Sequence, residues 1–193
     1  MRTLTFTALL SAALLAAGCG DTSSGPSPSK VIVTDIKVGA GGVSPQLVNG
    51  PLNSDVLTKG SVFDDLAQVT MEATLKDPGN PGAANTPSPL NAVTFTRYRV
   101  EYRRADGRNT PGVDVPFAFD GGMTLTVSDS VSTIIEIVRH AAKFEAPLGA
   151  LVSDPNIIST IATITFYGKD QAGNNVVVTA QAQVNFGNFA DPT

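Results

Sequence analysis

Two residue types that carry out nucleophilic or acid–base chemistry occur only once each in this 193-residue chain, as Cys19 and His140. A cysteine thiolate is a nucleophile, and histidine exchanges protons near neutral pH. His140 lies beside Arg139 in an apolar run, and the sequence around it does not have the form of a nucleophile elbow. We therefore interpret His140 as a partly buried or edge residue and predict no catalytic residue.

Cys19 comes at the end of a distinctive first segment, MRTLTFTALLSAALLAAGCG. Arg2 supplies a positive charge, residues 4–17 are uncharged and mostly apolar, and small residues precede the cysteine. The apolar stretch is short for a membrane span but typical of a signal-peptide core. The segment Leu15-Ala16-Ala17-Gly18-Cys19 resembles the lipobox of bacterial lipoprotein precursors.

The resemblance implies lipidation of the Cys19 thiol, with acyl chains such as palmitate, and cleavage after Gly18. The protein would then be held on a membrane of the cell envelope through lipid on Cys19. Gly20 stands where an Asp retains enterobacterial lipoproteins in the inner membrane, so the outer membrane is expected in a diderm host. The alternative is an ordinary signal peptide, which is disfavoured because no other cysteine occurs in the chain.

These signals divide the chain into three parts. Residues 1–18 are the predicted signal peptide, and residues 19–30 are the lipidated N-terminus and a flexible tether. From residue 20 the tether reads GDTSSGPSPSK, which contains no hydrophobic side chain. Residues 31–189 are expected to form a single domain.

Composition excludes several functional classes. With 17 acidic and 13 Lys or Arg residues the formal net charge is −4, so no nucleic-acid partner is expected. A single cysteine rules out an intrachain disulfide and, with one histidine, leaves too few ligands for a zinc site. The chain contains no P-loop and no GxGxxG after a strand, and we predict no cofactor.

Arginines form the one concentration of basic residues. Arg97, Arg99 and Arg103 share one face of a predicted strand, and they could bind a carboxylate or an acidic glycan. The favoured alternative is a solvated face whose charges pair with Glu101 and with acidic residues of a neighbouring strand. These arginines are therefore weak candidates for a binding site.

Several aspartates fall at predicted strand ends or loops, where calcium sites are also found. None has the spacing that directs several oxygens to one ion, so turn and cap roles are favoured and no metal is predicted. The residues are Asp64, Asp65, Asp77, Asp120, Asp129, Asp154 and Asp170.

Alternation of apolar and polar residues dominates the rest of the chain and predicts antiparallel strands. We expect a β-hairpin over residues 160–187, a β-bulge near Thr96, and a turn at Gly121-Gly122. The predicted strands are 30–38, 67–76, 93–104, 113–119, 123–127, 161–168 and 176–186.

Three further segments are less regular. Residues 132–144 fit either a strand or a helix, and their β-branched residues favour the strand. Residues 39–62 and 77–91 are rich in Gly, Pro and Asn and are predicted to be long loops, suited to a binding surface or to no particular function.

The pattern predicts an all-β fold, an antiparallel two-sheet sandwich. Tyr167 followed by Asp170-Gln171-Ala172-Gly173-Asn174 resembles the closing hairpin of bacterial immunoglobulin-like and fibronectin-like domains, which implies an immunoglobulin-like sandwich. The first functional hypothesis is a non-enzymatic envelope lipoprotein for binding or assembly, with a protein or glycan partner. The alternatives are an envelope hydrolase using a carboxylate pair and an accessory subunit of a larger envelope complex.

Overall fold

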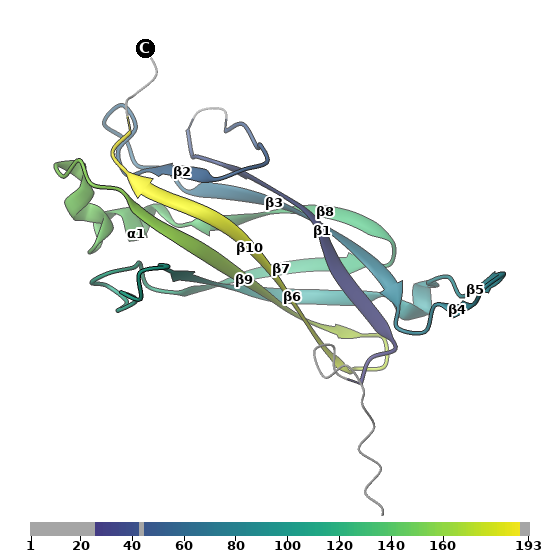
Figure 1. The fold of residues 1–193 in the computed structure, drawn as a ribbon. Coiled ribbons are helices and arrows are strands. Elements are labelled where there is room, and N and C mark those ends of the chain that lie inside the picture. Colours follow the sequence, from purple (N-terminus) through teal and green to yellow (C-terminus); the bar gives the residue numbers. More distant parts are fainter. Residues whose placement is uncertain (1–25, 43–44, 190–193) are drawn as a thin grey trace, which may run out of the picture.

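Two β-sheets form the framework of the protein, as seen in a computed structural model that describes residues 26–42 and 45–189 (Figure 1). The smaller is antiparallel, with order β1-β3-β8, and consists of β1 (Ser29–Gly39), β3 (Asp65–Leu75) and β8 (Ser130–Val138). The larger has order β2-β10-β9-β6-β7. Its strands are β2 (Leu52–Asp55), β10 (Asn175–Gly187), β9 (Ile158–Asp170), β6 (Val93–Arg103) and β7 (Phe119–Val127).

Small elements complete the described chain. A two-residue hairpin pairs β4 (Gly79–Asn80) with β5 (Ala83–Ala84), and 3-10 turns η2 (Pro89–Asn91) and η3 (Leu148–Val152) lie in connections. The helix α1 (His140–Phe144) is one turn long. No helix in residues 26–42 and 45–189 is long and apolar enough to span a membrane.

A single hydrophobic core gathers buried residues from both sheets. It contains the alternate residues that the period-2 pattern predicts, such as Val69 and Met71 from β3, both fully buried. The larger sheet contributes Phe95, Phe166 and Phe186, which are also fully buried. Complete burial of such a side chain stabilises the fold by about 1.5–3 kcal/mol relative to exposure.

The predicted hairpin and bulge are both confirmed. Strands β9 and β10 pair antiparallel across a four-residue turn, with Tyr167 opposite Val177. The register of β6 shifts between Phe95 and Arg97 against both neighbouring strands, so the extra residue is Thr96. The bulge explains why Phe95 and Tyr98, which are out of phase in the sequence, both face the core.

The strand predicted at residues 113–119 and the turn predicted at Gly121-Gly122 are wrong. Residues 110–115 form a tight local turn, in which Thr110 O accepts from the Asp114 amide at 2.8 Å. The Asp114 carboxylate in turn accepts from the Thr110 amide, so local bonds replace a strand ladder. Strand β7 then runs unbroken through both glycines.

The favoured strand over residues 132–144 is correct only as far as Val138, where β8 ends. His140 begins α1, and its backbone N–H donates to Asp64 Oδ1 at 2.5 Å. A carboxylate from another part of the chain therefore satisfies one of the free N–H groups at the start of this helix. That interaction spans 76 residues and could not be read from local sequence.

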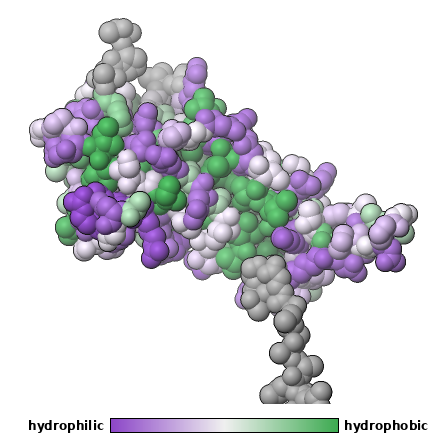
Figure 2. All heavy atoms as spheres, in the orientation of Figure 1, coloured by the Kyte–Doolittle hydropathy of each residue, from purple (hydrophilic) through white to green (hydrophobic). Residues whose placement is uncertain are grey.

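The predicted loops contain short strands, and the first strand begins early. Residues 39–62 include β2, which pairs in parallel with β10. Strand β1 starts at Ser29, two residues before the predicted domain boundary, and Ser29 Oγ donates to Asn91 O at 2.7 Å. In Figure 1 this start of β1 lies at the opposite end of the molecule from α1. Figure 2 shows hydrophobic residues along the seam where β1 lies beside β10.

Candidate functional site

The outer face of β6 carries the arginines singled out in the sequence. Arg97 Nη1 lies 3.3 Å from Asp120 Oδ1, and Arg99 Nη1 lies 2.8 Å from Asp120 Oδ2. Arg99 Nε also donates to Glu101 at 3.0 Å. Strand β7 therefore supplies the acidic neighbour expected for a paired strand face. Such exposed ion pairs typically contribute about 0–1 kcal/mol each.

Arg97 differs from the others because it also stacks on an aromatic ring. Its guanidinium carbon lies 3.8 Å from the centroid of the Tyr167 ring, and the strand register places the two residues opposite each other. The Arg97 side chain is 53% exposed, and its hydrogen bond to Asp120 is made through Nη1. Stacking on the ring fixes the orientation of the guanidinium plane, and the N–H groups at the edge of that plane can still donate hydrogen bonds to a ligand.

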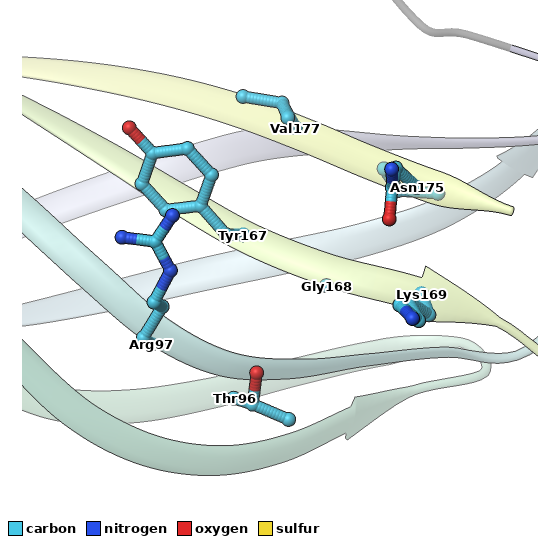
Figure 3. A pocket seen from close by; sticks show the side chains of 8 residues that line it. Thr96, Arg97, Tyr167, Gly168, Lys169, Asn175 and Val177 are labelled. Atoms are coloured by element: carbon cyan, nitrogen blue, oxygen red, sulfur yellow. The ribbon is translucent and has the colours of Figure 1, made fainter. Parts of the chain in front are cut away.

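A shallow hollow of about 410 Å³ adjoins this stack. Gly168 is among its lining residues, and a β-carbon there would come within 2.6 Å of Thr94 O. Lys169 and Asn175 line the hollow further along β9 and β10, as Figure 3 shows. We call the hollow lined by Arg97, Tyr167, Lys169 and Asn175 the arginine groove. The lining of the hollow includes two cationic side chains and no carboxylate, a composition suited to an anionic ligand.

Arg103 lies apart from the arginine groove, near the other end of β6. It is exposed, and within the described residues it makes no ion pair. Beyond it, Arg104 and Arg108 both contact Asp106, at 2.6 and 2.8 Å. Hydrogen bonds from these two guanidinium groups hold the pKa of the Asp106 carboxyl well below its ordinary range. The structure thus divides the predicted arginine row, with Arg97 and Arg99 in one place and Arg103 in another.

His140 is exposed and pairs with Asp64. The distance from His140 Nδ1 to Asp64 Oδ1 is 2.8 Å. Burial alone would raise the pKa of the Asp64 carboxyl, but hydrogen bonds from the His140 backbone and ring outweigh burial and lower the pKa. No serine or threonine hydroxyl donates to His140 in the described part of the chain, so this pair is better explained as a cap on α1.

A second acidic residue, Asp65, forms a buried polar cluster that sequence reasoning missed. The Lys143 Nζ lies 3.0 Å from Asp65 Oδ1, and both side chains are at most 1% exposed. Ser54 Oγ donates to Asp65 Oδ2 at 2.5 Å, and the Gly41 amide donates to Oδ1 at 2.7 Å. We call Asp65, Lys143, Ser54 and Gly41 the buried Lys–Asp cluster. A lysine inside an apolar run was the only sequence signal for it.

The remaining candidate calcium ligands are dispersed. No group of three acidic, His or Cys side chains that could hold a metal ion occurs among residues 26–42 and 45–189. Asp170 accepts from the Ala172 and Asn174 amides, and Asp77 accepts from the Gly79 amide. Both are turn residues of the kind expected from the sequence. Cys19 and the lipobox lie outside the described residues.

Comparison with known proteins adds little to this description. No family model matches the chain, and no curated protein matches it. Among solved structures, the chain is similar to the solution structure of a late embryogenesis abundant protein. The sequences are 12% identical, the match covers 82% of this chain and 71% of the other, and the TM-score is 0.42.

Proposed function

We propose that the protein is a lipid-anchored, non-enzymatic binding protein of the bacterial envelope. The anchor rests on the lipobox-like segment ending at Cys19, with the outer membrane as its place in a diderm host. Two acyl chains hold a protein stably on a membrane, whereas one binds only marginally. The Gly, Ser and Pro residues that follow would separate the folded body from the lipid surface.

An immunoglobulin-like sandwich is the fold we propose for the body. Its support is the presence of a three-stranded and a five-stranded sheet, together with one hydrophobic core to which both contribute. The short strand β2 adds in parallel to β10, while all other neighbours in both sheets are antiparallel. In immunoglobulin variable domains, loops clustered at one end of the sandwich form the binding site, whereas the function of any one domain depends on its own residues.

The arginine groove is the binding site that the geometry supports best, and its ligand would be an acidic glycan. The observation that carries the proposal is the Arg97 guanidinium held 3.8 Å over the Tyr167 ring on a side chain that is 53% exposed. Lys169 supplies a second positive charge and Asn175 an amide beside the same hollow. A sugar carboxylate would meet Arg97 and Lys169, while its neighbouring hydroxyls would meet Asn175.

The anchor is tested by replacing the lipidated residue. In Cys19→Ser, the protein should leave the membrane fraction and lose metabolic labelling with a palmitate analogue. A Cys19→Ser protein that remains lipid-labelled and membrane-bound would refute the anchor.

The ligand class is tested by titrating the protein with an oligomer of a uronic acid and with a neutral hexose oligomer of equal length. The acidic oligomer should bind, and Arg97→Ala should weaken binding about tenfold or more, because a charge-assisted hydrogen bond contributes about 1.5–3 kcal/mol. Arg103→Ala is the matched control and should leave affinity unchanged, since Arg103 lies at the far end of β6. Equal affinity for the neutral oligomer, or an equal loss in Arg103→Ala, would contradict the assignment.

A further inference from the structure

The buried Lys–Asp cluster places an amine against a carboxyl group with water excluded. Asp65 is fully buried, Lys143 is 2% exposed, and the two groups are 3.0 Å apart from Nζ to Oδ1. Transferring an ammonium and a carboxylate from water into the protein interior costs several kcal/mol for each ion. The electrostatic attraction between the two ions can be smaller than this desolvation penalty. The pair also joins residues 78 positions apart, from β3 and from α1.

The groups around the pair are hydrogen-bond partners that a reacting carboxyl would need. The Ser54 hydroxyl and the Gly41 amide donate to the two Asp65 oxygens, at 2.5 and 2.7 Å. On the other side, Lys143 Nζ donates to Asp55 O at 2.8 Å, which fixes the direction of the amine. Fixed donors aimed at a carboxyl oxygen stabilise negative charge that develops there when a nucleophile adds.

From this geometry we propose that Lys143 and Asp65 condense to form an intramolecular amide bond, which covalently links α1 to β3. The proposal is independent of the anchor and of the arginine groove. It assigns a covalent modification to a chain whose single cysteine excludes an intrachain disulfide. The link would tie the segment between β8 and β9 to the core of the smaller sheet.

The reaction needs no other reactant. Lys143 Nζ first gives one proton to the Asp65 carboxylate, so that a neutral amine faces a neutral carboxylic acid. The nitrogen lone pair then forms a bond to Asp65 Cγ, and the carboxyl oxygen takes up negative charge next to the Ser54 and Gly41 donors. A second nitrogen proton passes to the acid hydroxyl, the C–O bond breaks, and one water leaves.

Burial favours both the proton transfer and the attack. Loss of solvent raises the pKa of the Asp65 carboxyl, against the opposing effects of Lys143 and the two donors, so the neutral acid is more accessible than in water. A desolvated lysine amine is also a better nucleophile than an exposed ammonium. Holding the two groups in contact replaces an encounter in solution by a reaction within one molecule.

Tryptic digestion of the full chain, purified from cells and denatured, tests the proposal directly. Trypsin cleaves after free lysine, so an unmodified chain releases residues 140–143 as a tetrapeptide and residues 60–76 as a separate peptide. The amide blocks cleavage after Lys143 and joins residues 60–76 to residues 140–169, at the sum of their masses less one water. Mass spectrometry should find the joined peptide and little of the tetrapeptide.

Controls within the chain make the result specific. Lys37 lies 3.9 Å from Asp35 in an exposed ion pair, and trypsin should cleave after it normally in the same digest. Lys143→Arg should separate the two peptides, and Ser54→Ala should lower the joined fraction by removing one donor from the carboxyl. Release of residues 140–143 in full from the wild-type chain, with residues 60–76 at unmodified mass, would overturn the proposal.

Discussion

The ring of Tyr98 lies so close over the backbone of Gly121 that no other residue fits there. A β-carbon at Gly121 would come within 2.2 Å of Tyr98 Cζ, and the two residues are paired across β6 and β7. The glycine therefore creates space for a buried aromatic ring, which also packs edge-on against Phe119 at a centroid distance of 6.3 Å. This contact explains a glycine pair that in the sequence resembles a turn.

Gly121→Ala should destabilise the fold. The added methyl group must displace the buried Tyr98 ring or the β7 backbone, and overpacking of this kind costs about 1–3 kcal/mol. Chemical denaturation measures the loss. Gly122→Ala is a close control, because no atom lies within 4 Å of a β-carbon at that position. Equal losses in the two variants would show that glycine flexibility, and not the Tyr98 contact, sets the effect.

Tyr102→Phe should also lower the free energy of unfolding. The Tyr102 hydroxyl is buried and donates to Ile137 O at 2.5 Å, which joins β6 of one sheet to β8 of the other. Leaving a buried carbonyl without this donor costs about 1–3 kcal/mol. Tyr167→Phe serves as the control, since its hydroxyl has no hydrogen-bond partner among the described residues, and its effect should be within about 0.5 kcal/mol.

Acid should weaken the β9–β10 turn through Asp170. A side-chain hydrogen bond from Asn174, with further amide donors, holds the pKa of the Asp170 carboxyl below its ordinary value of 3.8. A carboxyl whose pKa is lower in the folded state stabilises the fold above its unfolded pKa, and that contribution is lost as pH falls through the folded pKa. The stability difference between wild type and Asp170→Asn should therefore be largest near neutrality and shrink below about pH 4.

Denaturant titrations of both proteins across this pH range provide the measurement. Asp129→Asn is a suitable comparison, because the Asp129 side chain makes no hydrogen bond in the described residues. A constant difference between wild type and Asp170→Asn at every pH would contradict the role given to the Asp170 charge.

Asp120→Asn should strengthen binding of an acidic glycan, the reverse of Arg97→Ala. Asp120 lies 3.3 Å from Arg97 and 2.8 Å from Arg99, so its charge offsets theirs at the edge of the arginine groove. Removing that charge should raise affinity severalfold at low salt, and the gain should fade as salt screens it. Calorimetric titration at two salt concentrations would show this, and unchanged affinity at low salt would count against the groove.

Much of the fold follows from local pattern. Alternation predicts β3, β9 and β10 because one face of each is buried, and a one-residue register slip would expose Val69 or Phe166. The phase change between Phe95 and Tyr98 predicts the bulge at Thr96 for the same reason. These features depend on which side chains must be buried, and the sequence contains that information directly.

The remaining features depend on contacts between distant residues. Strand β2 has only four residues, and its extended conformation depends on parallel pairing with β10, in which Asn53 lies opposite Asn185 and Ser54 opposite Phe186. Nothing near Lys143 reveals that Asp65 lies 3.0 Å away, and nothing near Gly121 reveals the Tyr98 ring. Local patterns do not encode such distances, so the buried Lys–Asp cluster could be found only in three dimensions.

Strand β1 runs between two ends of the molecule that carry different features. Its eleven residues, at about 3.3 Å each, span about 36 Å from the end where the chain enters the body to the end that holds α1. The arginine groove lies toward the entry end, near the β9–β10 turn, and the buried Lys–Asp cluster lies at the other. If the N-terminus is anchored by lipid as proposed, the arginine groove would lie on the membrane side of the body and the buried Lys–Asp cluster on the far side.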